Sequence, residues 1–171
     1  MQSTTRVLVI MRHAKAEPSA PTDHERVLTD RGTSDAGEAG AWLGAAGTRP
    51  GRALVSDAAR TRGTWAALAG GAGWDVVPEF DASLYAAGPD TALDLFRETD
   101  DAVDTLVVIG HNPTMAYVAQ MLDDGDGDAA AVAAMNEGFP ASAVAVFAVD
   151  GAWADLEMGG ARLTAFHVGH G

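Results

Sequence analysis

Short apolar segments recur along the chain, and several of them end abruptly at polar or charged residues. Residues 7–11 are five consecutive apolar residues, three of them Val or Ile, and Arg12 and His13 follow at once. Such a run is typical of a strand that is buried on both faces of a sheet. The segments 52–56 and 105–109 have the same character and predict two further strands.

Between these strands, apolar residues recur at the spacing of a helix. The segment 31–46 shows this spacing, and Thr29 or Asp30 is placed to cap its start. A second helix is expected after the strand 52–56, with Ser56 or Asp57 as its cap and its end near Gly70. Three more helices are expected over 90–99 with Pro89 in the first turn, over 113–122 with Asn112 as cap and Pro113 in the first position, and over 129–135.

Two stretches of the first half are less regular. Residues 16–26 and 81–88 lack apolar periodicity and predict loops. Residues 74–80 between them predict a short edge strand that is limited by Pro78.

The C-terminal part predicts antiparallel strands. Residues 143–149 and 153–158 form an expected hairpin that turns at residues 150–151, and 162–168 forms a final strand. The acidic run 123–128 lacks the terminal glutamate of a calcium loop, so we interpret it as a solvated turn.

Strands and helices alternate through most of the length. This order predicts an α/β fold with a mainly parallel sheet, covered on both faces, and antiparallel strands at the C-terminal end. A chain of 171 residues with 47% apolar content fits one domain over 1–171.

Composition narrows the classes of function. With 24 acidic against 11 basic residues the formal charge is -13, which disfavours nucleic acid and anionic membrane surfaces as partners. The chain has no cysteine, which excludes disulfides, thiolate metal sites and cysteine nucleophiles. The apolar run before Arg12 is shorter than a signal-peptide core or a membrane span, so we expect a cytoplasmic protein.

The candidate chemistry lies where three predicted strands end. Arg12 and His13 follow the first strand, Arg60 follows the second, and His111 follows the strand 105–109. Parallel strands bring these ends to one edge of a sheet, where ligands of α/β proteins bind. Two arginines, two histidines and nearby helix N-termini predict a phosphate-binding crevice in an otherwise acidic protein.

At these residues the chain resembles the histidine phosphatase superfamily, in particular its short phosphohistidine phosphatase branch typified by SixA. The resemblance covers nearly the whole chain. It rests on RHAKA at 12–16, RVLTDRG at 26–32, SDAARTRGT at 56–64, GHNP at 110–113 and PAS at 140–142. Two departures are Ala14, where glycine is frequent in the superfamily, and the Arg62-Gly63 pair in the third motif.

The resemblance implies a three-layer, phosphoglycerate-mutase-like α/β/α sandwich in which His13 is the phosphorylated nucleophile. Arg12, Arg60 and His111 would form the phosphate pocket. Arg60 and Arg62 cannot both face it, because residues two apart on a helix diverge, and the motif selects Arg60.

The charges suggest a mechanism. A neutral His13, held in one tautomer, would attack phosphorus in line and give a phosphohistidine that water hydrolyses, without a metal or cofactor. The two arginines would stabilise the charge in transit, and His111, protonated beside a dianion, would supply a further donor.

Other candidates remain open on sequence alone. Lys15 and Arg26 either extend the substrate-binding pocket or lie at its rim. The acids able to protonate a leaving group are Asp23, Glu79 and Asp81, although a solvated loop is the simpler interpretation of each. His24, His167 and His170 are expected to be surface or terminal residues.

We therefore expect a phosphatase for a protein phosphohistidine or for a small phosphorylated metabolite. A non-catalytic phosphate sensor or scaffold is the alternative, although binding alone would not need His13. A metal-binding module is a third possibility, since the chain has five histidines and many acids, but none shows a recognised ligand spacing. The partner protein and the oligomeric state cannot be inferred from the sequence.

Overall fold

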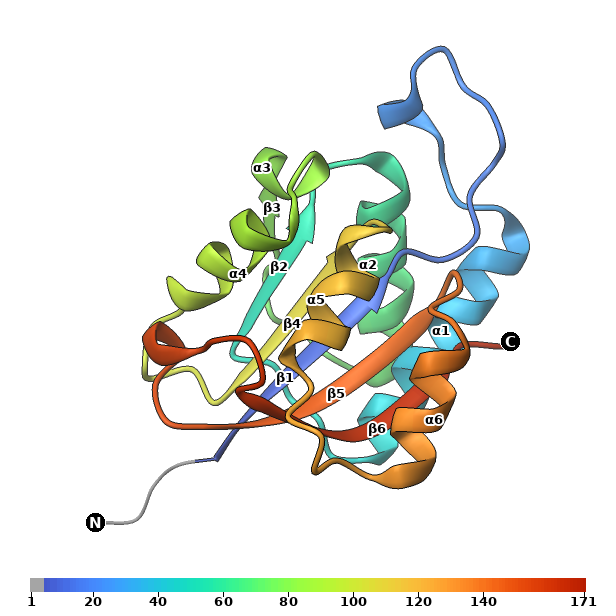
Figure 1. The fold of residues 1–171 in the computed structure, drawn as a ribbon. Helices are drawn as coiled ribbons and strands as arrows, with labels where there is room; N and C mark the ends of the chain where they lie inside the picture. Colours follow the sequence, from blue (N-terminus) through green and yellow to red (C-terminus); the bar gives the residue numbers. More distant parts are fainter. Residues whose placement is uncertain (1–4) are drawn as a thin grey trace.

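A computed structural model describes residues 5–171 and shows a mixed α/β fold built around one twisted sheet (Figure 1). Within these residues the sheet has six strands in the order β3-β2-β4-β1-β5-β6. The strands are β1 (Thr5–Arg12), β2 (Arg52–Ser56), β3 (Glu79–Asp81), β4 (Thr105–Gly110), β5 (Ala143–Asp150) and β6 (Ala161–Val168).

The first four strands in the sequence are parallel, as the alternating pattern predicts. In the register of the sheet Arg12 pairs with Gly110 and Val55 pairs with Ile109, so β1, β2 and β4 end at the same edge. The two C-terminal strands are antiparallel and extend the sheet beyond β1. The topology therefore brings the predicted strand ends together.

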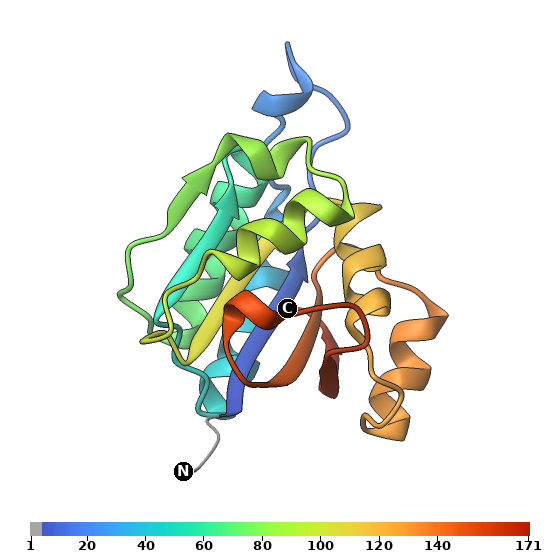
Figure 2. The ribbon, with the colours of Figure 1, turned by 60° about the vertical axis from the view of Figure 1, so that its left-hand side comes forward.

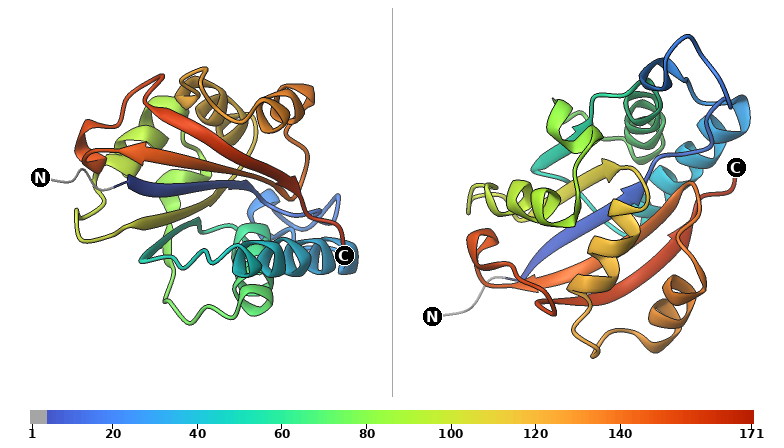
Figure 3. Two further views of the ribbon diagram at one scale, coloured as in Figure 1. Left: turned by 90° about the horizontal axis from the view of Figure 1, so that it is seen from below. Right: turned by 45° about the horizontal axis from the view of Figure 1, so that its top comes forward.

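Helices cover both faces of the sheet, which gives three layers (Figure 3, left). One face is covered by α1 (Asp30–Ala45) and α2 (Ala59–Ala72), whose apolar residues pack on Val9, Met11 and their neighbours. The other face is covered by α4 (Pro89–Arg97), α5 (Thr114–Leu122) and α6 (Ala129–Glu137). Figure 2 shows α4 in front of the parallel strands.

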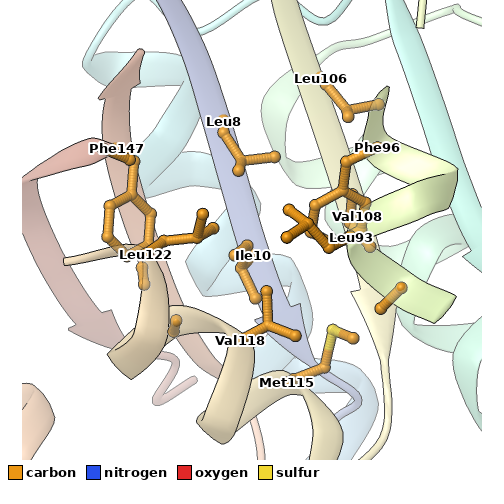
Figure 4. Close-up of a cluster of buried hydrophobic side chains, with 14 of the residues drawn as sticks. Leu8, Ile10, Leu93, Phe96, Leu106, Val108, Met115, Val118, Leu122 and Phe147 are labelled. Atoms are coloured by element: carbon orange, nitrogen blue, oxygen red, sulfur yellow. The ribbon is translucent and has the colours of Figure 1, made fainter. Parts of the chain in front are cut away.

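Alternation along the strands sends neighbouring side chains into different cores. Leu8 and Ile10 of β1 point toward Phe96 of α4 and Val118 of α5 (Figure 4), whereas Val9 packs on the opposite face. All of these strand residues are fully buried. This two-sided burial explains why the strand sequences are continuous apolar runs.

The N-terminal half corrects three predictions. The segment 81–88, predicted as a loop, contains the short helix α3 (Ala82–Tyr85), which the side chain of Asp81 caps. The cap of α2 is Ala58 rather than Ser56 or Asp57, because the Ser56 side chain is directed to another partner. The loop before α1 includes one turn of 3-10 helix, η1 (Asp23–Glu25).

In the C-terminal half the structure corrects two further predictions. The segment 153–158 does not pair with β5; it contains η2 (Trp153–Asp155), and β5 pairs with β6 instead. The buried indole of Trp153 donates to the carbonyl oxygen of Val103 at 2.8 Å, a contact that a solvated hairpin strand would lack. The helix α5 begins after Pro113, one residue later than expected, and Asn112 makes a weak contact to Ala116 N at 3.3 Å.

Within residues 5–171, none of the helices has the length and apolar character that a bilayer crossing requires.

Candidate active site

The candidate site lies at the edge of the sheet where β1, β2 and β4 end. Arg12 is the last residue of β1 and His13 follows it, while His111 follows the last residue of β4. Ser56 ends β2, and Arg60 lies in the first turn of α2. The segment that carries η1 and the helix α3 also lie at this end of the sheet (Figure 3, right).

His13 is held in one tautomer by the backbone. Its Nδ1 lies 2.7 Å from the carbonyl oxygen of Ala14, which can only accept a hydrogen bond. The proton is therefore on Nδ1, and Nε2 carries a free lone pair. The side chain is 9% exposed, and burial, together with the positive charges of Arg60 and Arg12, lowers the pKa of His13 to about 4. At neutral pH this histidine is therefore uncharged, with an unprotonated Nε2.

His111 is the second imidazole of the site. Its ring centroid lies 5.4 Å from that of His13, and its Nε2 lies 2.7 Å from the buried hydroxyl of Ser56. Among the described residues its buried Nδ1 has no hydrogen-bond partner. Burial and the charge of Arg60 lower the pKa of His111 to about 3, so the ring is neutral before a substrate binds. The protonated His111 expected from the sequence is a different state, in which a phosphate dianion already lies beside the ring.

The two predicted arginines differ in burial and in their partners, since Arg12 is partly buried and Arg60 is buried. Arg12 donates from Nη1 to the carbonyl oxygen of Phe139 at 3.2 Å, and no carboxylate of residues 5–171 lies within 4.0 Å of its guanidinium. Arg60 is 6% exposed and donates to both the backbone oxygen and the carboxylate of Asp23, at 2.9 and 3.1 Å. Arg12 thus offers a positive charge that has no ionic partner among the described residues.

Asp23 occupies a position that the sequence does not reveal. Its carboxylate accepts from Arg60, from Arg26 Nε at 2.9 Å and from the hydroxyl of Tyr85. These hydrogen bonds, with Tyr85 first, hold the pKa of Asp23 below its usual range. Asp23 therefore presents an ionised carboxylate where two arginines converge.

Tyr85 and Ser56 are site residues that the sequence analysis misses. The ring of Tyr85 meets the ring of His111 edge-on, with centroids 5.3 Å apart, and Arg60 lies over it. Tyr85 comes from α3, which the pattern did not predict, and Ser56 appeared only as a helix cap. The signal for Ser56 is its place at the end of a strand, the same place that identified Arg12.

The remaining candidates are exposed or have partners of their own. The side chain of Lys15 is exposed. Arg62 is also exposed and stacks on Phe80 at 3.9 Å, so it diverges from Arg60. Glu79 pairs with Arg52 at 2.7 Å, and Asp81 caps α3. Of the three acids considered, Asp23 is the one that contacts Arg60.

The arrangement suits in-line phosphoryl transfer. It combines a neutral imidazole nitrogen, nearby guanidinium groups and a second imidazole on a rigid sheet edge. Within the described part of the chain, neither His13 nor His111 belongs to a group of three His, Cys, Asp or Glu residues with converging donor atoms.

Comparison with solved structures gives likenesses over the whole length. The proposed phosphohistidine phosphatase SixA of Nakamurella multipartitia is 34% identical, with a TM-score of 0.85 over 96% of both chains. A second proposed SixA, from Agrobacterium tumefaciens, is 28% identical, with a TM-score of 0.77 over 95% of this chain and 98% of that one. The protein histidine phosphatase SixA in complex with tungstate shares the fold at 23% identity and a TM-score of 0.72, over 95% of this chain and 96% of that one.

Sequence comparison finds relatives without an assigned activity. An uncharacterised protein of Mycobacterium tuberculosis is 42% identical over 160 residues, which are 92% of this chain and 99% of that protein. An uncharacterised protein of Mycobacterium leprae is 34% identical over 163 residues, again 92% of this chain and 99% of that protein. No profile of a known protein family matches the chain.

Proposed function

This chain belongs to the histidine phosphatase superfamily, in its short SixA-like branch, and from that premise we propose that it is a metal-independent phosphatase acting on phosphohistidine in a cytoplasmic protein. The observation that carries the proposal is the state of His13. Its Nε2 is unprotonated at neutral pH, its Nδ1 is fixed by Ala14, and Arg60 and Arg12 are close enough to lower its pKa. A ring prepared in this way is suited to attack phosphorus.

In the first step, Nε2 of His13 forms a bond to phosphorus while the bond from phosphorus to the leaving group breaks in line. Arg12 and Arg60 bind the equatorial oxygens, whose negative charge the guanidinium groups stabilise as the phosphoryl group moves. The product is a phosphohistidine on His13, and the leaving group departs with its electron pair.

In the second step, water attacks the same phosphorus and the bond from phosphorus to Nε2 breaks. Inorganic phosphate is released and His13 returns to its neutral form. His111 donates to a phosphoryl oxygen once the dianion has raised its pKa from the low value of the free site. Ser56 holds the ring of His111 in place for that contact through the 2.7 Å hydrogen bond to Nε2.

The proposed preference for phosphohistidine follows from the state of Asp23. An alkyl ester expels an alkoxide, which needs a positioned acid worth roughly 100-fold to 10,000-fold in rate. Asp23 is the carboxyl group nearest Arg60, and its low pKa leaves no proton to give at neutral pH. A phosphohistidine expels imidazole, whose ordinary pKa of about 6.5 allows it to leave with little help.

A substrate comparison tests this proposal. A phosphohistidine-containing protein, a small phosphoramidate, an aryl phosphate and an alkyl phosphate are compared by kcat/KM with the wild-type protein. We expect the phosphoramidates and the aryl phosphate to exceed the alkyl ester by at least about 100-fold. A comparable kcat/KM for the alkyl ester would contradict the proposed preference, and no turnover of any of them would favour the phosphate-sensor alternative.

The same assay tests metal independence and the choice between protein and metabolite. Treatment with a chelator is expected to leave kcat/KM unchanged, since the proposal assigns the positive charge of the site to its guanidinium groups. If kcat/KM falls on chelation and one metal ion restores it, this part of the proposal is wrong. A small phosphorylated metabolite hydrolysed faster than the phosphohistidine protein would assign the site to metabolites instead.

A further inference from the structure

A second histidine cluster lies outside the candidate active site. It joins Glu38 of α1 to His167 of β6 and to His170, which follows β6. Oε1 of Glu38 lies 2.7 Å from Nε2 of His167 and 3.3 Å from Nδ1 of His170. The proposed phosphatase reaction uses none of these three residues.

The fold positions His167 firmly. Trp42 lies one helical turn after Glu38 on α1, and its indole stacks on the imidazole of His167 with centroids 4.5 Å apart and an interplanar angle of 8°. The side chain of His167 is only 16% exposed, whereas a surface position was expected from the sequence. Glu38 and Trp42 thus hold one ring from two sides.

The segment after β6 is fixed as well. Its backbone donates from Gly169 to the oxygen of Ser142 at 3.0 Å and from His170 to Oε1 of Glu38 at 2.9 Å. The side chain of His170 is 74% exposed, and its Nδ1 lies 3.0 Å from the carbonyl oxygen of Val168. The exposed ring can turn toward Glu38 by giving up this one contact. The cluster therefore has two fixed members and one adaptable member with access to solvent.

We propose that Glu38, His167 and His170 form a binding site for a divalent transition metal, with Zn²⁺ as the reference ion. Zinc takes nitrogen and oxygen donors at about 2 Å, so two donors of a tetrahedral site lie about 3.3 Å apart. The donor atoms of the three residues all lie within 4.8 Å of one another, and the two distances to Oε1 are 2.7 and 3.3 Å. An opening of the contact between Glu38 and His167 from 2.7 Å to about 3.3 Å, with a rotation of the exposed His170 ring, completes the three protein ligands.

The chemistry of the donors selects the ion. Two imidazoles and one carboxylate favour Zn²⁺, Ni²⁺ or Cu²⁺ over Mg²⁺ and Ca²⁺, which prefer oxygen ligands. The fourth position faces solvent beside the exposed His170 and is filled by water. A metal here ties the chain after β6 to α1, so its expected effect is on stability rather than on turnover.

Titration of metal-free protein with ZnCl₂ by calorimetry tests the proposal. We expect one site per chain and a rise in Tm, with the affinity reduced at least tenfold in Glu38→Gln and in His170→Ala. His170→Ala removes an exposed ring, so that variant keeps its fold, which its Tm without metal verifies. The control is His24→Ala, another exposed histidine, which pairs with Asp57 outside the cluster.

The imidazoles of the active site are the alternative binding site for zinc. The variant His13→Ala distinguishes binding there from binding at the proposed site. Binding that persists in His13→Ala and weakens in His170→Ala supports the proposed site. Binding that disappears in His13→Ala and persists in His170→Ala would overturn it, as would the absence of binding at about 1 mM ZnCl₂. Neither result bears on whether His13 is the phosphatase nucleophile.

Discussion

His13 illustrates how burial can prepare a residue for chemistry. In water a histidine has a pKa of about 6.5 and is partly charged at neutral pH. Burial and two neighbouring arginines lower the pKa of His13 to about 4, and the hydrogen bond to Ala14 leaves the lone pair on Nε2. The guanidinium groups proposed to bind the phosphate therefore also keep the proposed nucleophile uncharged.

The low pKa of His13 predicts how stability depends on pH. The unfolded chain binds a proton at this residue below about pH 6.5, whereas the folded chain does not until about pH 4, so the free energy of unfolding falls as the pH drops through that interval. Between pH 7 and pH 4.5 the part of this loss that comes from His13 is about 2 kcal/mol. Urea unfolding at pH 7 and at pH 4.5 measures it.

The control replaces the histidine. In His13→Asn the decrease in the free energy of unfolding between pH 7 and pH 4.5 should be smaller by about 2 kcal/mol. The matched variant His24→Asn, at an exposed histidine, should show the same decrease as the wild type. An equal fall in wild type and His13→Asn would show that His13 does not hold its low pKa in the folded protein.

Asp23 predicts a second effect at the residue scale. Its carboxylate competes with an incoming oxyanion for Arg60 and Arg26, but it is 56% exposed, so solvent screens the ion pairs. Asp23→Asn should tighten tungstate binding roughly two- to fivefold. Glu79→Gln is the control, since that carboxylate pairs with Arg52 instead. Weaker tungstate binding in Asp23→Asn would mean that the carboxylate mainly positions Arg60.

The sequence predicts the site residues at the strand ends, but not the residues that contact them from distant parts of the same chain. Arg12, His13 and His111 stand directly after apolar runs, so the topology alone places them at one edge. Asp23 reaches Arg60 across 37 residues and meets Tyr85 across 62, and no local pattern encodes such contacts. The ionised state of Asp23, on which the proposed substrate preference rests, became visible only in the folded chain.

At the scale of elements, α1 and α2 pack unusually closely through glycine. A Cβ added at Gly40 would lie 2.0 Å from the backbone oxygen of Leu68, and one at Gly71 would lie 2.1 Å from the oxygen of Gly37. These neighbours are backbone atoms, which cannot move aside as the end of a flexible side chain can. These glycines therefore permit the contact between the two helices that cover one face of the sheet.

A pair of glycine substitutions tests this packing. Gly40→Ala should lower the free energy of unfolding by about 2 kcal/mol or more, because the helices must separate. Gly70→Ala is the matched control within α2: a Cβ there meets nothing within 4 Å, so it should raise stability by about 0.5–1 kcal/mol. Chemical unfolding of both variants gives the two values, and equal effects would contradict the close packing.

The element pattern was predictable where burial is uniform. The apolar runs of β1, β2 and β4 and the helices α1 and α4 were located within a few residues, because two-sided burial and helical spacing leave clear patterns. The prediction failed at 153–158, where Trp153 turns into the core and bonds to Val103. It also failed at α3, whose four residues are too few to show a period.

For the whole molecule, the contrast between global and local charge matters most. The chain carries a formal charge of -13, yet Arg12, Arg60 and Arg26 all lie near His13, as their effects on its pKa indicate. Under the proposed function, we expect an anionic substrate to be bound by these local guanidinium groups rather than attracted from a distance.

The covalent step is the central claim, and mass spectrometry of the quenched reaction tests it most directly. Wild-type protein mixed with a phosphoramidate and quenched in base should carry one phosphoryl group on the peptide that contains His13, and acid should remove it. His13→Ala should show neither the label nor turnover, while its circular dichroism matches the wild type. Sustained turnover by purified His13→Ala, or a label on another residue, would contradict the account.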